Sequence, residues 1–166
     1  LTPASRLTIT IDYFEIEVEN RIALSGNFRL TQAQRDQLAA QGIPGGGSFE
    51  EVSFFTNSFD SRTRGVDLVG TYRFPLFDGD AVLGANVNYT STEVTRATPV
   101  IAADRERVRE LEDFVPSWKG NLSFDYDRDR IGLALRATYY GEWTDYGGTP
   151  AADQTGGSEV LFDAEV

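Results

Sequence analysis

The stretch GVDLVGTYRFPLFDGDAVLGANVNYT, residues 65–90, decides the fold of this chain. Two alternating runs lie on either side of residues 78–80, Asp-Gly-Asp, and each run has one apolar and one largely polar face, because strand side chains point to opposite faces with period two. Asp-Gly between such runs predicts a hairpin, since glycine accepts the positive φ that a tight turn needs. Tyr72 and Phe74 close the apolar stripe near the turn and Tyr89 closes it at the far end. An apolar stripe with aromatic ends is typical of a membrane-spanning β-hairpin.

The composition of the 166 residues narrows the class of protein. The net charge of −11 argues against a nucleic-acid partner, because phosphate binding rests on clustered Lys and Arg. The chain has no His and no Cys, which removes the commonest general base and the commonest zinc ligands, so we expect no catalytic site, metal or cofactor. No window approaches the roughly 18 consecutive apolar residues of a transmembrane helix, which leaves β-strands as the way to cross a membrane.

Similar alternation recurs along the whole chain, over residues 7–19, 52–76, 81–95, 117–126 and 131–146, and a sixth run begins at Val160. The connections alternate between long and short, so that short turns lie at one end of the strands and long loops at the other. This predicts an all-β, antiparallel up-and-down meander, as in outer-membrane barrels with short periplasmic turns and long extracellular loops. A soluble sandwich follows no such rule.

The three long connections differ in composition. In the first, Thr31 and Gln34 predict a capped short helix that ends at Gly42, followed by a flexible loop over residues 44–48. In the second, residues 96–115, the charged core DRERVRELED forms either a helical turn or an irregular segment, and we expect it to be a solvated surface segment. The third is the Gly-rich segment 147–157.

The apolar faces give the predicted lipid contacts, which are Leu68, Tyr72, Leu83, Val87, Leu122, Phe124, Leu133 and Leu135. In the first run the apolar parity that ends at Tyr13 continues as Glu15, Glu17 and Glu19. A strand of a soluble sandwich needs a bulge for such a change, whereas a membrane strand that leaves the lipid at Tyr13 needs none. The three carboxylates offer either a divalent-cation site or the wet part of the outward face, and we favour the second.

The candidate ligand contacts are few. Arg136, Tyr140 and Glu142 share the inward face of the fifth run near its outer end, where they either line a water-filled lumen, which we favour, or contact a ligand. Trp143 and Tyr146 fit an aromatic girdle or loop base, or stacking on a sugar or siderophore ring. A further group of acidic residues consists of Glu106, Glu110, Glu112 and Asp113. Catalysis by a pair of carboxylates needs both of them on one rigid element, and nothing in this segment provides that, so we expect no catalytic role.

Five pieces of the chain, in order and spacing, are similar to one known family: ITIDYFEIEVENRI, FFTNSFDSRTRGVDLVGTYRF, ANVNYTSTEV, VPSWKGNLSFDY and LRATYYGEWTDYGG. The spacing from Asn57 to the GVDL at residues 65–68, and the YYGEWTDY at residues 139–146, carry most of the resemblance. The chain resembles the C-terminal part of the β-barrel of TonB-dependent outer-membrane receptors.

The resemblance implies a barrel of about 22 strands and a plug domain. Residues 1–166 would be about six of those strands, a partial transmembrane barrel without the plug, the TonB-recruiting motif or the final strands. It also implies the outer membrane of a Gram-negative bacterium, contact with lipid and lipopolysaccharide, and import of a small-molecule nutrient (siderophore-bound iron, cobalamin or carbohydrate) with energy from the TonB complex acting through the plug. Two alternatives stay open, a soluble or secreted β-rich structural or binding module and a passive porin segment.

Overall fold

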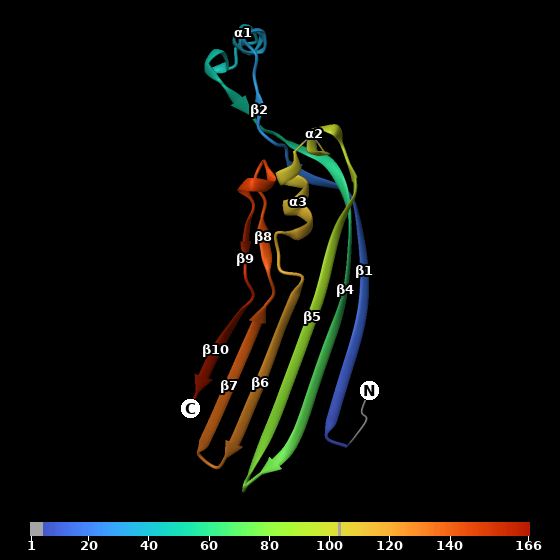
Figure 1. Ribbon diagram of the computed structural model, residues 1–166, viewed down its shortest axis with the longest axis vertical. Helices are drawn as coiled ribbons and strands as arrows, with labels where there is room; N and C mark the ends of the chain where they lie inside the picture. The colour runs from blue at the N-terminus through green and yellow to red at the C-terminus, as the bar shows by residue number, and fades with distance from the viewer. Residues whose placement is uncertain (1–4, 103) are drawn as a thin grey trace.

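The computed structural model describes residues 5–102 and 104–166, and its main element is a six-stranded antiparallel sheet (Figure 1). The strands in sheet order are β1 Leu7–Leu24, β4 Phe55–Leu76, β5 Gly79–Ala97, β6 Trp118–Arg128, β7 Ile131–Tyr140 and β10 Glu159–Glu165. Their order in the sheet follows their order in the chain, so the predicted up-and-down meander is confirmed. The sheet is open, with β1 and β10 at its two edges.

The register of the strands places their apolar positions on one side of the sheet. Residues directly opposite each other in an antiparallel ladder share a face. One row across the sheet consists of Ile9, Gly70, Ala85, Leu122, Ala137 and Phe162. The neighbouring row, one position along each strand, consists of Thr10, Val69, Asn86, Asn121, Thr138 and Leu161 and points to the other side. We call the side of the first row the apolar face and the other side the polar face.

The apolar face is open to its surroundings rather than packed into a core. Leu122 is 52% exposed and Phe162 is 80% exposed. Among the described residues, the buried apolar side chains are Ala23, Phe59 and Ala81. The sheet therefore has an extended apolar surface that no other part of the described chain covers.

Aromatic rings lie at both ends of the apolar face. Tyr72 and Phe74 stack at the end near the β4–β5 turn, with ring centroids 5.2 Å apart. Tyr89 and Trp118 lie opposite each other at the other end, with centroids 4.8 Å apart. Tyr13 shares this second end, because it pairs with Val66, which pairs with Tyr89.

Beyond Tyr13 the same side of the sheet becomes charged without a bulge, as predicted. The register runs unbroken from Leu7 to Val18. Glu15 lies opposite Arg64 at 3.3 Å, and Glu17 lies opposite Arg62 at 2.6 Å. The first bulge comes later, near Asn20, whose backbone N–H donates to Asp60 at 2.7 Å.

The two short turns each have two residues, and the position of the first differs from the prediction. The loop between β4 and β5 consists of Phe77 and Asp78, and Phe77 rather than Gly79 has the positive φ, at 52°. Gly79 is the first residue of β5, where a Cβ would overlap the carbonyl of Asp127. The Asp-Gly pair thus marks the hairpin correctly, but the glycine is required by a close approach of β6. In the β6–β7 turn, Asp129 has φ of 51°.

The first long connection contains β2 Phe28–Arg29, α1 Gln32–Ala40, the 3-10 helix Gly46–Ser48 and β3 Glu51–Val52, and projects beyond the sheet in Figure 1. The predicted capping box is confirmed, since the backbone N–H of Thr31 donates to the Gln34 side chain and that of Gln34 donates to Thr31 Oγ1. The predicted flexible loop is wrong. Residues 46–48 form a helical turn whose Gly46 is buried against Leu38 of α1.

The other two long connections are also folded. The second contains α2 Pro99–Ala102 and α3 Arg105–Asp113, and the third contains β8 Trp143–Asp145, the 3-10 helix Pro150–Ala152 and β9 Gln154–Gly156. Figure 1 shows these elements at the end of the sheet opposite the two short turns. No helix within residues 5–102 and 104–166 is long and apolar enough to cross a membrane.

We expect Gly65→Ala to destabilise the sheet more than Gly70→Ala. A Cβ at Gly65 would overlap the Phe14 ring on the opposite strand and lie 2.6 Å from the Tyr89 carbonyl oxygen, whereas at Gly70 the nearest atom is the Ala85 carbonyl oxygen at 4.0 Å. The first change should cost about 1–3 kcal/mol, as overpacking does. Chemical unfolding of the full-length protein, followed by tryptophan fluorescence, measures both, and equal midpoints would contradict the packing described.

Candidate functional site

Helix α3 is the centre of the structure at the loop end of the sheet. Asp104 caps it by accepting the Arg107 N–H at 3.1 Å. Val108 and Leu111, three positions apart on one side of the helix, pack against the buried pair Ala23 and Phe59, against which Val94 and Ala97 of β5 also pack. The prediction of a solvated surface segment is therefore wrong, because two apolar residues at helical spacing give this charged segment a side that packs on β5.

One carboxylate of α3 occupies an open edge of the sheet. Strand β5 continues past the start of β6, and the last main-chain bond between them is from Thr90 N–H to the Ser117 carbonyl. Farther along the same edge, the backbone N–H of Val94 donates to Glu112 Oε1 at 3.0 Å. The helix thus supplies a partner where the neighbouring strand is absent, which protects an edge that is otherwise unpaired.

An ion pair joins α3 to the third long connection. Arg105 donates to both carboxylate oxygens of Asp153, at 2.9 and 2.7 Å, and to the Gly147 carbonyl at 2.9 Å. Asp153 also accepts the Gly147 N–H at 3.1 Å. The hydrogen bonds from Arg105 lower the pKa of the Asp153 carboxyl below its usual value. The stabilisation from this pair is therefore present above the ordinary carboxyl pKa and is lost as the pH falls through the lowered one.

Tyr146 strengthens the same connection. Its hydroxyl donates to Asp113 Oδ2 at 3.2 Å. The guanidinium groups of Arg105 and Arg109 lie over its ring, 5.4 and 5.8 Å from the centroid. These contacts fix the loop of the β8–β9 hairpin to both ends of α3.

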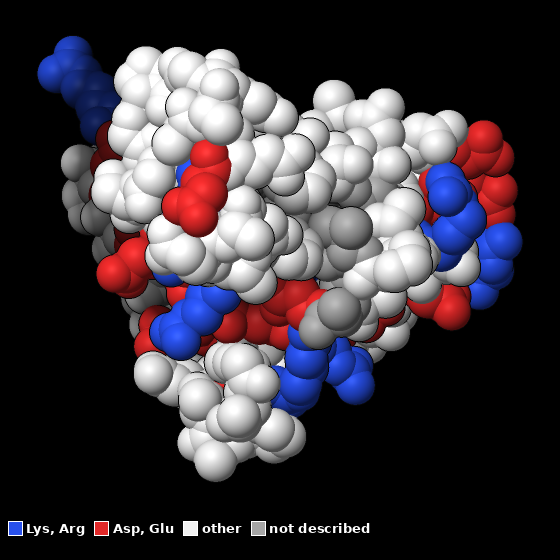
Figure 2. Space-filling view, turned by 90° about the horizontal axis from the view of Figure 1, so that it is seen from above, with Lys and Arg blue, Asp and Glu red and all other residues white. Residues whose placement is uncertain are grey.

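The first long connection also reaches the helix. Gly26 lies directly against the Asp104 carboxylate, since a Cβ on Gly26 would overlap it. Helix α3 and its N-cap Asp104 therefore contact both the first and the third long connections. Acidic and basic side chains mingle at this end of the molecule (Figure 2).

The five candidate ligand contacts do not form one site. Arg136 lies in the middle of β7, between Ser123 and Asp163 on the polar face, so its predicted place near the outer end is wrong. Tyr140 is four positions farther, about 13 Å along the strand. The remaining three lie past the end of β7. Glu142 is exposed, Trp143 lies against Gly156, and Tyr146 alone of the five contacts α3.

The eight predicted lipid contacts do share one side. Direct pairs place Tyr72 opposite Leu83, Leu83 opposite Phe124, and Phe124 opposite Leu135. The same ladder brings the other four onto the apolar face, namely Leu68, Val87, Leu122 and Leu133. Their contact with lipid stays a prediction.

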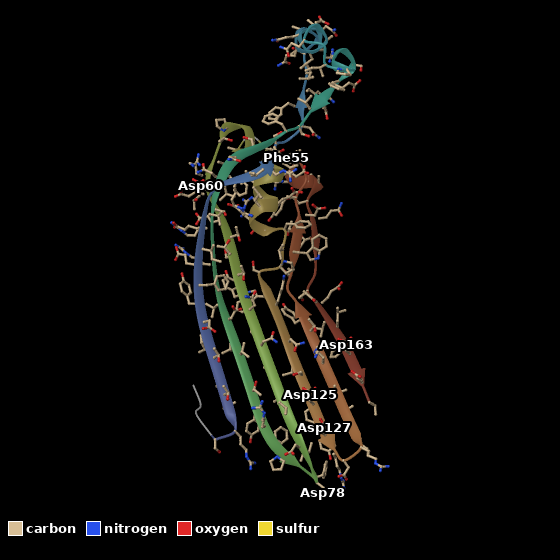
Figure 3. All side chains as sticks on the ribbon, turned by 180° about the vertical axis from the view of Figure 1, so that it is seen from behind. Phe55, Asp60, Asp78, Asp125, Asp127 and Asp163 are labelled. Atoms are coloured by element: carbon tan, nitrogen blue, oxygen red, sulfur yellow. The ribbon has the colours of Figure 1, made fainter. Side chains whose placement is uncertain are left out.

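Most carboxylates of the two predicted acidic groups have hydrogen-bond or ion-pair partners. Glu15 and Glu17 pair with arginines, Glu110 pairs with Arg107 at 2.9 Å, and Glu112 and Asp113 have the partners given above. Other carboxylates are spread along the polar face and its turn, as Asp163, Asp125, Asp127 and Asp78 show in Figure 3. Among the described residues, no group of three or more Asp or Glu is placed to hold a metal ion.

Sequence reasoning missed Arg105 and Asp153, the pair that joins two connections 48 residues apart in the chain. No local pattern marks such a pair. Asp104 carried a usable signal, since Asp before an amphipathic segment with Glu in its first turn is typical of a helix start.

One comparison with known proteins gives a match. The family model described as "TonB dependent receptor-like, beta-barrel" matches residues 1–166. The chain belongs to this family. Neither the search of curated proteins nor that of solved structures gives a match. Membership in the TonB-dependent receptor family supports an outer-membrane receptor or transport function in a Gram-negative bacterium, and it groups the chain with transporters rather than with enzymes.

We expect Asp104→Ala to loosen α3 and Asp104→Ser to leave it intact. Alanine removes the N-cap, which costs about 1 kcal/mol, whereas serine keeps an oxygen for the Arg107 N–H. Hydrogen exchange of the full-length receptor measures this at the amides of residues 107–109. Equal protection in the two variants would show that the cap does not hold the helix.

Proposed function

We propose that this chain is a wall segment of an outer-membrane active-transport receptor that imports a scarce nutrient with TonB-coupled energy. The nutrient classes that the family suggests are siderophore-bound iron, cobalamin and carbohydrate. The observation that carries the proposal is that one side of the sheet is apolar and exposed, with aromatic rings at both ends, while the other side is polar. Family membership supports the same conclusion.

The height of the apolar face agrees with a lipid contact. On β4 its apolar parity runs from Val66 to Leu76, ten residue steps. At about 3.3 Å per residue this is roughly 33 Å along the strand, or about 25 Å of height at a tilt of about 40°. Outer-membrane barrels have an apolar band of about 25 Å.

The polar face suits the water-filled side of such a wall. Its amides donate to carboxylates and hydroxyls across strands, as in Asn88 to Asp67 at 2.7 Å and Asn121 to Thr138 at 3.2 Å. Arg136 and Tyr140 extend from this face and stay our candidates for contact with a plug or a ligand.

The two edges of the sheet support a larger closed barrel. In hydrocarbon every backbone N–H and C=O group needs a partner, and β1 and β10 are the edge strands of the six-stranded sheet. We therefore infer that further strands of the same barrel, about 22 in all, pair with both edges. The short turns then face the periplasm, and the loops around α3 face the outside.

The proposal predicts opposite outcomes for two neighbouring substitutions, Leu122→Arg and Asn121→Arg. Leu122 lies midway between Trp118 and Tyr126 on the apolar face, so an arginine there should cost about 2–4 kcal/mol in the membrane. Asn121 lies on the polar face, where the new charge stays in water. Folding of the full-length receptor into lipid vesicles measures both, and normal folding of Leu122→Arg would overturn the lipid assignment.

Transport itself is tested by nutrient uptake in cells with and without the full-length receptor. We expect uptake of one of the three nutrient classes, and we expect it to stop when the proton-motive force is collapsed. Uptake that persists without energy would indicate a passive porin. Recovery of the protein in the soluble fraction would indicate a soluble β-rich module.

A further inference from the structure

The polar face holds a small cavity beside the C-terminal end of α3, with a volume of about 190 Å³. It lies where β5 begins to extend past β6, so one wall comes from the sheet and the other from α3 and the segment that follows it. Its lining residues include Asn88, Thr90, Thr92 and Lys119 on the sheet, and Glu110 and Phe114 on the other wall.

We propose that this cavity binds one sugar ring of a carbohydrate nutrient, with Lys119 and Glu110 as its main hydrogen-bonding groups. The inference rests on the proposed import function and narrows its three nutrient classes to one. The size of the cavity, its donors and acceptors, and the aromatic ring at its edge all fit such a ligand.

The size of the cavity separates the three classes. Pockets that enclose drug-sized molecules have volumes of about 300–1,000 Å³. A siderophore complex of iron and cobalamin are at least as large as such molecules, so neither fits into 190 Å³. A single sugar ring with its hydroxyl groups is smaller and fits.

The two walls present both donors and acceptors. Lys119 is the only lysine of the chain, and no described residue forms a hydrogen bond or an ion pair with its ammonium, so all three of its donors are open to a ligand. On the other wall, Glu110 accepts from Arg107 at 2.9 Å through Oε2, and its other oxygen can accept from a ligand. A sugar hydroxyl both donates and accepts, so neighbouring hydroxyls can bond to the ammonium and to the carboxylate.

The polar side chains of the sheet wall are held by their neighbours. Thr90 Oγ1 donates to Asn88 Oδ1 at 3.1 Å, and Asn88 Nδ2 donates to Asp67 Oδ1 at 2.7 Å. The hydroxyls of Thr92 and Thr63 share a hydrogen bond of 3.0 Å. Side chains that are already ordered lose little freedom when a ligand binds, which favours affinity.

An aromatic ring lies at the edge of the cavity. Phe114 lines the cavity and is 50% exposed, so its ring is accessible to a ligand. The apolar C–H face of a sugar ring can stack on such a surface. Tyr140 lies opposite Lys119 on the polar face, which places one of the candidate ligand contacts next to this cavity.

Binding to the purified full-length receptor, measured by calorimetry, tests the inference. The ligands are oligosaccharides of glucose, galactose, mannose, xylose, N-acetylglucosamine and galacturonate, together with a ferric siderophore and cobalamin for comparison. We expect oligosaccharides of at least one of these sugars to bind. Lys119→Met and Glu110→Gln should each weaken that binding about five- to tenfold, because each removes a charged hydrogen-bonding group.

Two matched variants serve as controls. Arg73→Met removes a cation from the polar face near the short turns, and Glu106→Gln changes an exposed carboxylate of α3 that does not line the cavity. Both should bind the sugar as the wild type does. The thermal unfolding midpoint of every variant shows that it is folded.

Two results would overturn the inference. In the first, no oligosaccharide of the panel binds. In the second, an oligosaccharide binds, and Lys119→Met and Glu110→Gln bind it as tightly as the wild type, so the sugar site lies elsewhere. Binding is measured without the TonB complex, so a failure of energised uptake would contradict the proposed function and leave a sugar site standing. Binding and import of the siderophore or cobalamin alone would do the reverse.

Discussion

The antiparallel register of the six strands, unbroken over the length of the apolar face, is the interaction on which the rest of the structure depends. Because opposite residues share a face, one correct pair between two strands fixes the side on which every other residue of that pair lies. A slip of one residue between β5 and β6 would send Leu122 to the polar face and Asn121 to the apolar face. The apolar face, its two aromatic ends and the row of bonded amides behind it all follow from this single alignment.

The same alignment accounts for how the sheet is stabilised. Very few of its described side chains are buried, so the sheet is stabilised by main-chain hydrogen bonds and cross-strand side-chain pairs rather than by a hydrophobic core. Sheets with one exposed apolar face need a cover, and for a member of this receptor family lipid is the cover we propose. At the loop end, β5 extends past the start of β6 and lacks a neighbouring strand. There α3 packs through a small apolar contact, and its Glu112 carboxylate accepts a hydrogen bond from the edge of β5.

The sequence predicts the strands well and the site poorly, because the strands follow from a local pattern whereas the site is formed by residues that are far apart in the chain. Alternation is local, so the faces of β4, β5, β6 and β7 could be assigned from each run alone. The position of the turn was off by one residue, because Phe77 accepts a positive φ where glycine was expected. The docking of α3 depends on residues such as Asp153 that are distant in the chain, and no local pattern encodes them. For the same reason, residues of one parity on β7 were grouped although Arg136 and Tyr140 are four positions apart.

The central claim is that alternate residues of each strand face lipid and water. Spin labels placed one at a time along residues 118–126 of the full-length receptor in lipid vesicles test it directly, through collisions with oxygen, which dissolves in lipid, and with a water-soluble nickel complex. We expect oxygen contact to peak at positions 120, 122 and 124, and nickel contact to peak at positions 119, 121 and 123. Equal access at neighbouring positions, or the reversed alternation, would contradict this account of the sheet.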